Sequence, residues 1–239
     1  MEEYVRFKNY STEDFGLEKM SGLCWDTDGG FWTFSEEGLV HHNGLYKEQF
    51  TYDRLGGNHP ISDKIVGFQT IASNDLWFSY RDTSVLTKVN TLTNEFSHYH
   101  IEELNNDSTL EALIVRVKEA PSGQLWLCTW GKGLIKFYPE DQSKNKTYIF
   151  GDSTVHAESG LFIKDIAFMS EDSIFVTFFN GRSKTQSHPG YFDTVTEEFE
   201  YLDIPSLIAH LPENQAKNTR IACRIIHFVH QDEEGNFWL

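Results

Sequence analysis

Histidine, aspartate and cysteine are the residue types in this chain that could hold a metal ion or attack a substrate. Ten histidines occur in 239 residues. His41 and His42 are adjacent, while His98 and His100 alternate and so share one face of an expected strand. A closed zinc site needs four ligands, and each pair supplies two. We therefore expect solvated histidines and no metal site.

Two polar turns resemble ligand-binding loops. Asp26 and Asp28 suggest a calcium loop, but that loop needs a further acid where Gly30 stands. Gly131-Lys132-Gly133 has the wrong frame for a phosphate loop and fits a hairpin turn instead. The sequence therefore predicts structural turns at both places and no cofactor.

The familiar catalytic motifs are missing from the sequence. It contains no Gly-x-Ser-x-Gly elbow, no His-Glu-x-x-His and no Walker loop. Its three cysteines, Cys24, Cys128 and Cys223, form no Cys-x-x-Cys pair and stand among strand-like residues, so we expect small buried side chains. These observations predict a protein that is not an enzyme and that has no catalytic residues.

The charge and hydropathy pattern excludes two classes of partner. The formal charge is −16, and no basic run offsets it, which argues against nucleic acid. No apolar run of about 18 residues exists, so no membrane insertion is expected within the chain. The first residues, Met1-Glu2-Glu3-Tyr4, lack the basic and apolar segments of a signal peptide.

The elements that must position any functional side chain are set by a repeat, a polar turn followed by an aromatic residue on a strand. The anchor aromatics are Trp32, Trp77, Trp126, Phe175 and Trp238. They are separated by 45, 49, 49 and 63 residues. We expect these rings to pack between adjacent repeats, and the longer last interval to contain a loop insertion.

Each repeat predicts four short antiparallel strands. In the third, strands are expected over 112–120, 125–129, 134–138 and 146–150, separated by turns rich in Gly, Pro and Ser. One four-stranded sheet per repeat is the pattern of a β-propeller. The predicted fold is an all-β propeller of four-stranded antiparallel blades, about four full blades plus partial ones, in a truncated ring.

We expect residues 1–239 to form one propeller domain or a fragment of one. The predicted blades span residues 20–55, 61–101, 110–150, 160–203 and 219–239. The last is expected to be incomplete, because Leu239 falls inside its second strand. Val5-Arg6-Phe7 resembles the closing strand of an earlier blade.

The repeats resemble the two-component regulator propeller repeat. The best match is Gly123 to Thr129 followed by Gly133-Leu134-Ile135-Lys136-Phe137, and the first repeat matches through Gly30-Phe31-Trp32 and Gly38-Leu39-Val40. The second repeat departs in lacking a glycine before Val85, and the fourth has Phe175 in place of tryptophan. The resemblance spans nearly the whole chain.

The resemblance implies a function as well as a fold. Propellers of that family form the extracytoplasmic sensor region of membrane-bound histidine kinases, often hybrid ones, and commonly sense carbohydrates or other nutrients in the periplasm. It therefore implies a non-catalytic, periplasmic sensor segment, with any kinase outside this chain. Two alternatives stay open: an interaction scaffold, with a homodimer formed through one face, and a propeller lyase.

Propeller geometry points to one face as the place for a ligand. The turn between the second and third strands emerges beside the connection to the next blade, and loops on a rigid scaffold carry function. Arg81, Trp130, Lys132 and Arg182 stand in these turns and are the predicted ligand-binding residues. An ordinary solvated rim is the alternative interpretation of the same turns.

Overall fold

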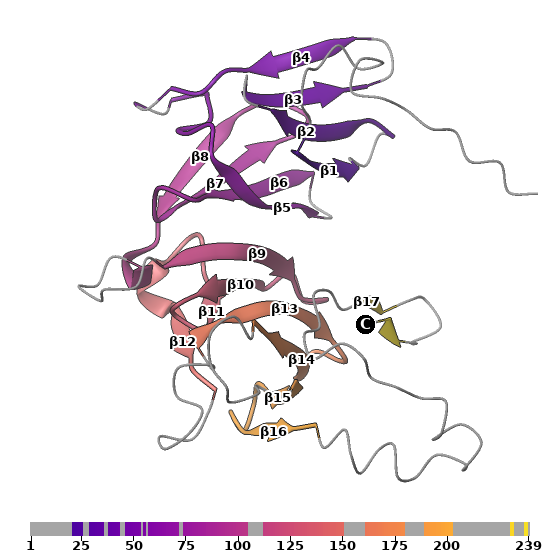
Figure 1. Cartoon of the computed structure of the whole chain (residues 1–239), viewed down its shortest axis with the longest axis vertical. Coiled ribbons are helices and arrows are strands. Elements are labelled where there is room, and N and C mark those ends of the chain that lie inside the picture. Colours follow the sequence, from indigo (N-terminus) through magenta and orange to yellow (C-terminus); the bar gives the residue numbers. More distant parts are fainter. Residues whose placement is uncertain are drawn as a thin grey trace, which may run out of the picture.

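The computed structural model shows an all-β protein whose sheets follow one another in chain order (Figure 1). The structure describes residues 21–25, 29–35, 38–43, 46–53, 55, 57–71, 74–104, 112–150, 161–179, 189–202, 230–231 and 237–238. Four four-stranded sheets and one two-stranded hairpin occur in this part of the chain. The predicted propeller of four-stranded blades is thus confirmed.

The strands have the following bounds. Blade 1 contains β1 Ser21–Trp25, β2 Phe31–Ser35, β3 Gly38–His42 and β4 Lys47–Phe50. Blade 2 contains β5 Ile65–Ile71, β6 Asp75–Tyr80, β7 Val85–Asn90 and β8 Phe96–His100. Blade 3 contains β9 Leu113–Glu119, β10 Leu125–Trp130, β11 Leu134–Phe137 and β12 Lys146–Tyr148. Blade 4 contains β13 Ile163–Phe168, β14 Ser173–Phe178, β15 Gly190–Asp193 and β16 Phe199–Tyr201, and the hairpin contains β17 His230–Gln231 and β18 Phe237–Trp238. Short 3₁₀ helices span Glu102–Leu104 and Gln142–Lys144.

Each blade is an antiparallel meander, and the first strand of each lies on the inside. The order β5-β6-β7-β8 of blade 2 is repeated in the other three sheets. The inner strands β1, β5, β9 and β13 contact one another in sequence, and β17 contacts β13. This arrangement places the start of each inner strand beside the propeller axis.

The anchor aromatics lie between blades because side chains of a strand alternate between its two faces. On β10, Leu125 and Leu127 face blade 2, whereas Trp126 and Cys128 face blade 4. Trp32, Trp77, Trp126 and Phe175 are all at most 4% exposed. Each of the three tryptophans faces the blade that follows it in sequence. Phe175 lies on the face of blade 4 that points away from blade 3.

Aromatic contacts across the blade boundaries repeat with the same geometry. The Trp77 ring meets Phe137 of the next blade edge-to-face with centroids 6.2 Å apart, and Trp126 meets Phe192 in the same way at 6.4 Å. Edge-to-face pairs add to the free energy gained from burying the rings. The blades are therefore joined by equivalent contacts, as the repeat predicts.

In blades 1 to 3, the residue of the third strand that is paired with the anchor packs over the anchor ring. His41 stacks on Trp32 with centroids 4.3 Å apart. The ammonium groups of Lys88 and Lys136 lie 5.8 and 5.6 Å from the centroids of their paired tryptophans. These cross-strand pairs complete the coat around each buried indole.

A register shift typical of a β-bulge interrupts the inner strand of each of the four four-stranded blades. The pairing of the first two strands shifts at Gly22, at 67–68, at Val115 and at Lys164. In blade 2, the buried Ser79 hydroxyl lies 2.8 Å from the carbonyl oxygen of Val66 and 2.6 Å from that of Ile114 on β9. This hydroxyl links the inner strands of blades 2 and 3 at the point where the ladder of β5 is disrupted.

A glycine is required at the start of the third strand, because the backbone there lies directly against the backbone of the fourth strand. Gly133 has a φ of +78°, and a Cβ added there would collide with the carbonyl oxygen of Tyr148. Gly38 meets Phe50 in the same way. The Gly-Leu element of the repeat therefore marks a close approach of two strands.

The histidines are not simply solvated, which corrects the sequence interpretation. His42 is 8% exposed and stacks on Phe31 at 4.6 Å, and His98 forms hydrogen bonds through both ring nitrogens. The difference arises because His42 packs on a ring of the neighbouring strand, and His98 is bonded to the neighbouring strand and to the connection before β5. In the described ranges, no group of three or more His, Cys, Asp or Glu could hold a metal ion. Nor do those ranges contain a helix long and apolar enough to cross a membrane.

Candidate ligand-binding face

The turns between second and third strands share one face with the connections between blades, here named the connection face. The Arg81 amide donates to the carbonyl of Lys64 at 2.9 Å, joining the β6–β7 turn to the segment that enters β5. The amides of Gly131 and Gly133 donate to the carbonyl of Leu161 at 2.8 and 2.9 Å. We define the connection face, in the described residues, as 57–66, 81–84, 101–104, 130–133, 161–164 and 179, which are these turns, the connections and the strand ends beside them.

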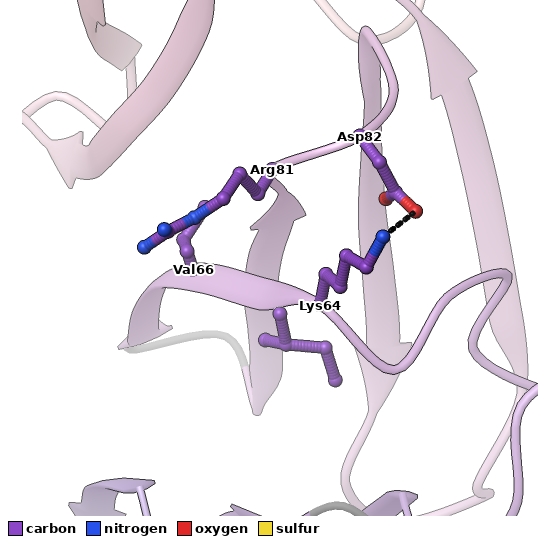
Figure 2. Close-up of a pocket in the computed structure, with 5 residues that line it drawn as sticks. Lys64, Val66, Arg81 and Asp82 are labelled. Atoms are coloured by element: carbon purple, nitrogen blue, oxygen red, sulfur yellow. Dashed lines mark ion pairs between the residues drawn. The ribbon is translucent and has the colours of Figure 1, made fainter.

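An open pocket lies on this face at blade 2. It has a volume of about 520 Å³ and is lined by Lys64, Ile65, Val66, Arg81 and Asp82. Figure 2 shows Lys64 and Asp82 pointing toward each other, whereas Arg81 extends to the opposite side, beside Val66. Lys64 Nζ lies 3.6 Å from Asp82 Oδ2. Of the predicted ligand-binding residues that the structure describes, Arg81 lines this pocket.

The segment before β5 is held in place by hydrogen bonds to β6 and to the turn that follows it. The Ser62 hydroxyl donates to Asp82 Oδ2 at 3.0 Å and accepts from the Lys64 amide at 3.1 Å. The Ile61 amide donates to the buried Tyr80 hydroxyl at 3.1 Å. Burial raises the pKa of Tyr80 to about 12, so the hydroxyl remains protonated. These bonds fix the rim of the pocket.

Trp130 belongs to an aromatic cluster between blades 3 and 4. It is the last residue of β10, and its ring lies 5.7 Å from Phe162 and 4.4 Å from Phe179. Lys164 Nζ lies 5.4 Å from the Phe179 centroid. The sequence interpretation placed Trp130 in the turn, but Gly131 and Gly133, both with positive φ, make that turn and leave Trp130 paired with Leu113. The indole is half-buried rather than a free rim side chain.

Charged side chains gather on the inner strands beside this cluster. Lys118 Nζ on β9 lies 3.2 Å from Asp165 Oδ1 on β13, and Asp165 is 2% exposed. Burial lowers the pKa of Lys164, and the nearby Arg116 lowers it further, while Asp165 opposes both effects. The inner strands of blades 3 and 4 thus present several cations close to the propeller axis.

The remaining predicted residues do not join these two groups in the described structure. Lys132 is half-buried in the β10–β11 turn, where its amide donates to Thr129 Oγ1 at 3.1 Å. Arg182 lies outside the described residues, as do Asp26, Asp28 and Cys223. Trp238 is the last residue of β18, but its side chain is not described. Cys128 is fully buried, and burial raises the pKa of its thiol, which makes it a poor nucleophile at neutral pH.

Sequence reasoning missed Lys64, Asp82, Phe162, Phe179 and Lys164. Lys64 and Phe162 stand just before inner strands, where the connection has no periodicity. Phe179 follows an apolar strand at the same position as Arg81 and Trp130 in their blades. Aligning the residue four positions after each anchor is the signal that could identify Phe179.

Comparison with known proteins gives likeness in structure rather than in sequence. No family model matches the sequence, and no curated protein matches it either. The extracellular domain of BT3049, assigned to the hybrid two-component systems of B. thetaiotaomicron, aligns with a TM-score of 0.65 and 14% identity over 97% of this chain and 28% of that one. The extracellular domain of BT4673 from the same organism aligns with a TM-score of 0.61 and 14% identity over 92% and 25%.

A lyase has the same blade architecture. Virginiamycin B lyase from Staphylococcus aureus aligns with a TM-score of 0.61 and 11% identity over 92% of this chain and 62% of that one. The chain spans about a quarter of the length of the two extracellular domains. The predicted resemblance is therefore confirmed at the level of the fold: this chain has the propeller architecture of the extracellular domains of two-component system proteins.

Proposed function

We propose that this chain is a non-catalytic segment of an extracytoplasmic sensor propeller from a two-component regulator, and that it binds a carbohydrate or another small nutrient on its connection face. The fold shared with the extracellular domains of two such systems supports the sensor role. Packing or hydrogen bonds hold His41, His42 and His98, and the thiol of Cys128 is buried. These contacts support a binding role over catalysis.

The Trp130 cluster is the observation that carries the binding proposal. Three aromatic rings, none fully buried, converge beside the half-buried ammonium of Lys164. Small-molecule sites are typically lined by aromatic side chains with a few polar groups that fix orientation. An aromatic surface of this kind suits the apolar face of a sugar ring, and Lys164 suits an oxygen substituent.

Binding is tested by titrating the chain with a panel of neutral mono- and oligosaccharides, using calorimetry and thermal shift. The native chain should show saturable binding, and Trp130→Ala should abolish it. Trp25→Ala is the matched control, because Trp25 is 63% exposed at the other end of an inner strand, and this variant should bind normally. A panel without any binding, or binding indifferent to Trp130→Ala, contradicts the proposal.

The sensor role has its own test in the gene. We expect the reading frame that contains this chain to encode further blades, a membrane-spanning helix and a histidine kinase.

A homodimer formed through the connection face is the competing use of the same surface. Sedimentation of the native chain and of Trp130→Ala distinguishes a dimer interface from a ligand-binding site, since a dimer formed through this face would dissociate in the variant.

A further inference from the structure

We propose that the pocket at blade 2 binds a small molecule through a carboxylate group, with Arg81 as the residue that holds the anion. This inference rests on the proposed ligand-binding function and specifies the chemical class of the ligand. It concerns a different place on the connection face from the Trp130 cluster.

The pocket has the size and the fixed rim of a small-molecule site. Its volume of about 520 Å³ falls in the range of about 300–1,000 Å³ that is usual for such sites. The main chain of Arg81 is tied to Lys64, and the side chain of Asp82 is tied to Ser62. A ligand would therefore meet a wall that is already ordered, which lowers the entropy lost on binding.

The charges that line the pocket leave one cation over. Lys64 is paired with Asp82 at 3.6 Å. Within the described part of the chain, no carboxylate lies in ion-pair distance of the exposed Arg81 guanidinium. Among the described residues of the lining, two cations and one anion give a formal charge of +1. That charge is balanced by a ligand carrying a single negative charge.

The chemistry of arginine favours a carboxylate as that anion. The planar guanidinium offers parallel N–H donors that match the two oxygens of a carboxylate. Val66 beside it gives an apolar wall for the carbon skeleton of the ligand (Figure 2). A phosphate dianion would instead leave one charge without a partner. The chain as a whole carries −16, so an anion held here depends on this local contact rather than on long-range attraction.

The test compares ligands that differ in one group. Calorimetric titration of the full chain with sodium glucuronate should show binding at least about tenfold tighter than with glucose, the loss expected when a charged hydrogen bond is removed. Arg81→Gln should abolish this difference. Lys144→Gln, which removes an exposed cation outside the connection face, should preserve it. Asp82→Asn should strengthen glucuronate binding several-fold, because it releases Lys64.

Each outcome bears on a definite claim. Equal affinity for glucuronate and glucose, or tight glucuronate binding retained in Arg81→Gln, would overturn the carboxylate inference while leaving the ligand-binding function intact. Tighter binding of glucose 6-sulfate or glucose 6-phosphate than of glucuronate would also overturn it, in favour of another oxyanion. Absence of binding by any of these sugars, together with failure of the carbohydrate panel, would overturn the proposed function itself.

Discussion

The Tyr80 hydroxyl lies 2.9 Å from Thr87 Oγ1 on the neighbouring strand, at the centre of a hydrogen-bond chain across blade 2. Thr87 Oγ1 lies 2.9 Å from His98 Nδ1, and His98 Nε2 lies 3.2 Å from the carbonyl oxygen of Gly57. That carbonyl can only accept, so Nε2 carries the proton and Nδ1 accepts from Thr87. The Ile61 amide donates to Tyr80, and Tyr80 in turn donates to Thr87. Each hydrogen bond in this chain therefore has a defined donor and a defined acceptor.

The first prediction concerns acid. Burial lowers the pKa of His98, and it lowers the pKa of His42 as well. The unfolded chain therefore binds protons at a higher pH than the folded chain, and the free energy of unfolding should fall as the pH drops below about 6.5. Protonated His98 would also donate from Nδ1, so Thr87 could no longer donate its own proton to His98. Urea unfolding between pH 7.5 and pH 5.5 should show this loss, and His98→Gln should reduce it. A pH dependence unchanged in that variant would contradict the assignment.

The second prediction separates two kinds of glycine. Gly123 and Gly133 both have positive φ, at +85° and +78°. A Cβ at Gly123 would make only an ordinary contact with Glu119 Oε1 at 3.8 Å, whereas one at Gly133 would collide with the Tyr148 carbonyl oxygen. Gly123→Ala should cost about 1–2 kcal/mol from backbone strain alone, and Gly133→Ala should cost clearly more. Chemical denaturation of both variants measures the difference. Equal losses would show that the strands move apart easily.

The third prediction concerns the anchors. Trp126 is 2% exposed and packs against Phe192 of the next blade, while Trp25 is 63% exposed. Trp126→Ala should lower the free energy of unfolding by about 3–5 kcal/mol, because it leaves a large cavity. Trp25→Ala should lower it by less than about 1 kcal/mol. Thermal and urea unfolding provide the comparison. Similar effects of the two substitutions would mean that the blade boundary adds little stability.

The fourth prediction compares two ion pairs. Asp165 of the Lys118 pair is 2% exposed, whereas Lys64 and Asp82 are 59% and 39% exposed. Lys118→Met should cost about 2–4 kcal/mol, since it leaves a buried carboxylate without this partner. Lys64→Met should cost at most about 1 kcal/mol. A double-mutant cycle with Asp165→Asn isolates the coupling between Lys118 and Asp165, and a coupling near zero would refute this account.

The sequence predicts the fold well where the signal is periodic. Trp32, Trp77 and Trp126 recur at nearly constant intervals beside turn residues, and two-residue alternation then places them on a buried face. The limits of β7 follow directly from Val85 to Asn90 between two turns. Local patterns therefore carry the blades and their order.

The pocket could not be predicted in this way. Lys64 and Asp82 are 18 positions apart, and they meet because the connection into β5 returns beside the β6–β7 turn. The bulges were also hidden, since Gly22, Val115 and Lys164 share no side-chain character. Both features depend on how separate strands meet in space, which alternation along one strand does not record.

The packing of each anchor toward the following blade has a consequence for how such a ring can evolve. Each internal blade presents its anchor tryptophan to the following blade and the leucine before that anchor, Leu76 or Leu125, to the preceding blade, so the described junctions are head-to-tail contacts of the same kind. Duplication or loss of a whole repeat would restore an equivalent junction at the point of insertion or excision. Blade number can therefore change by recombination between repeats without the invention of a new interface.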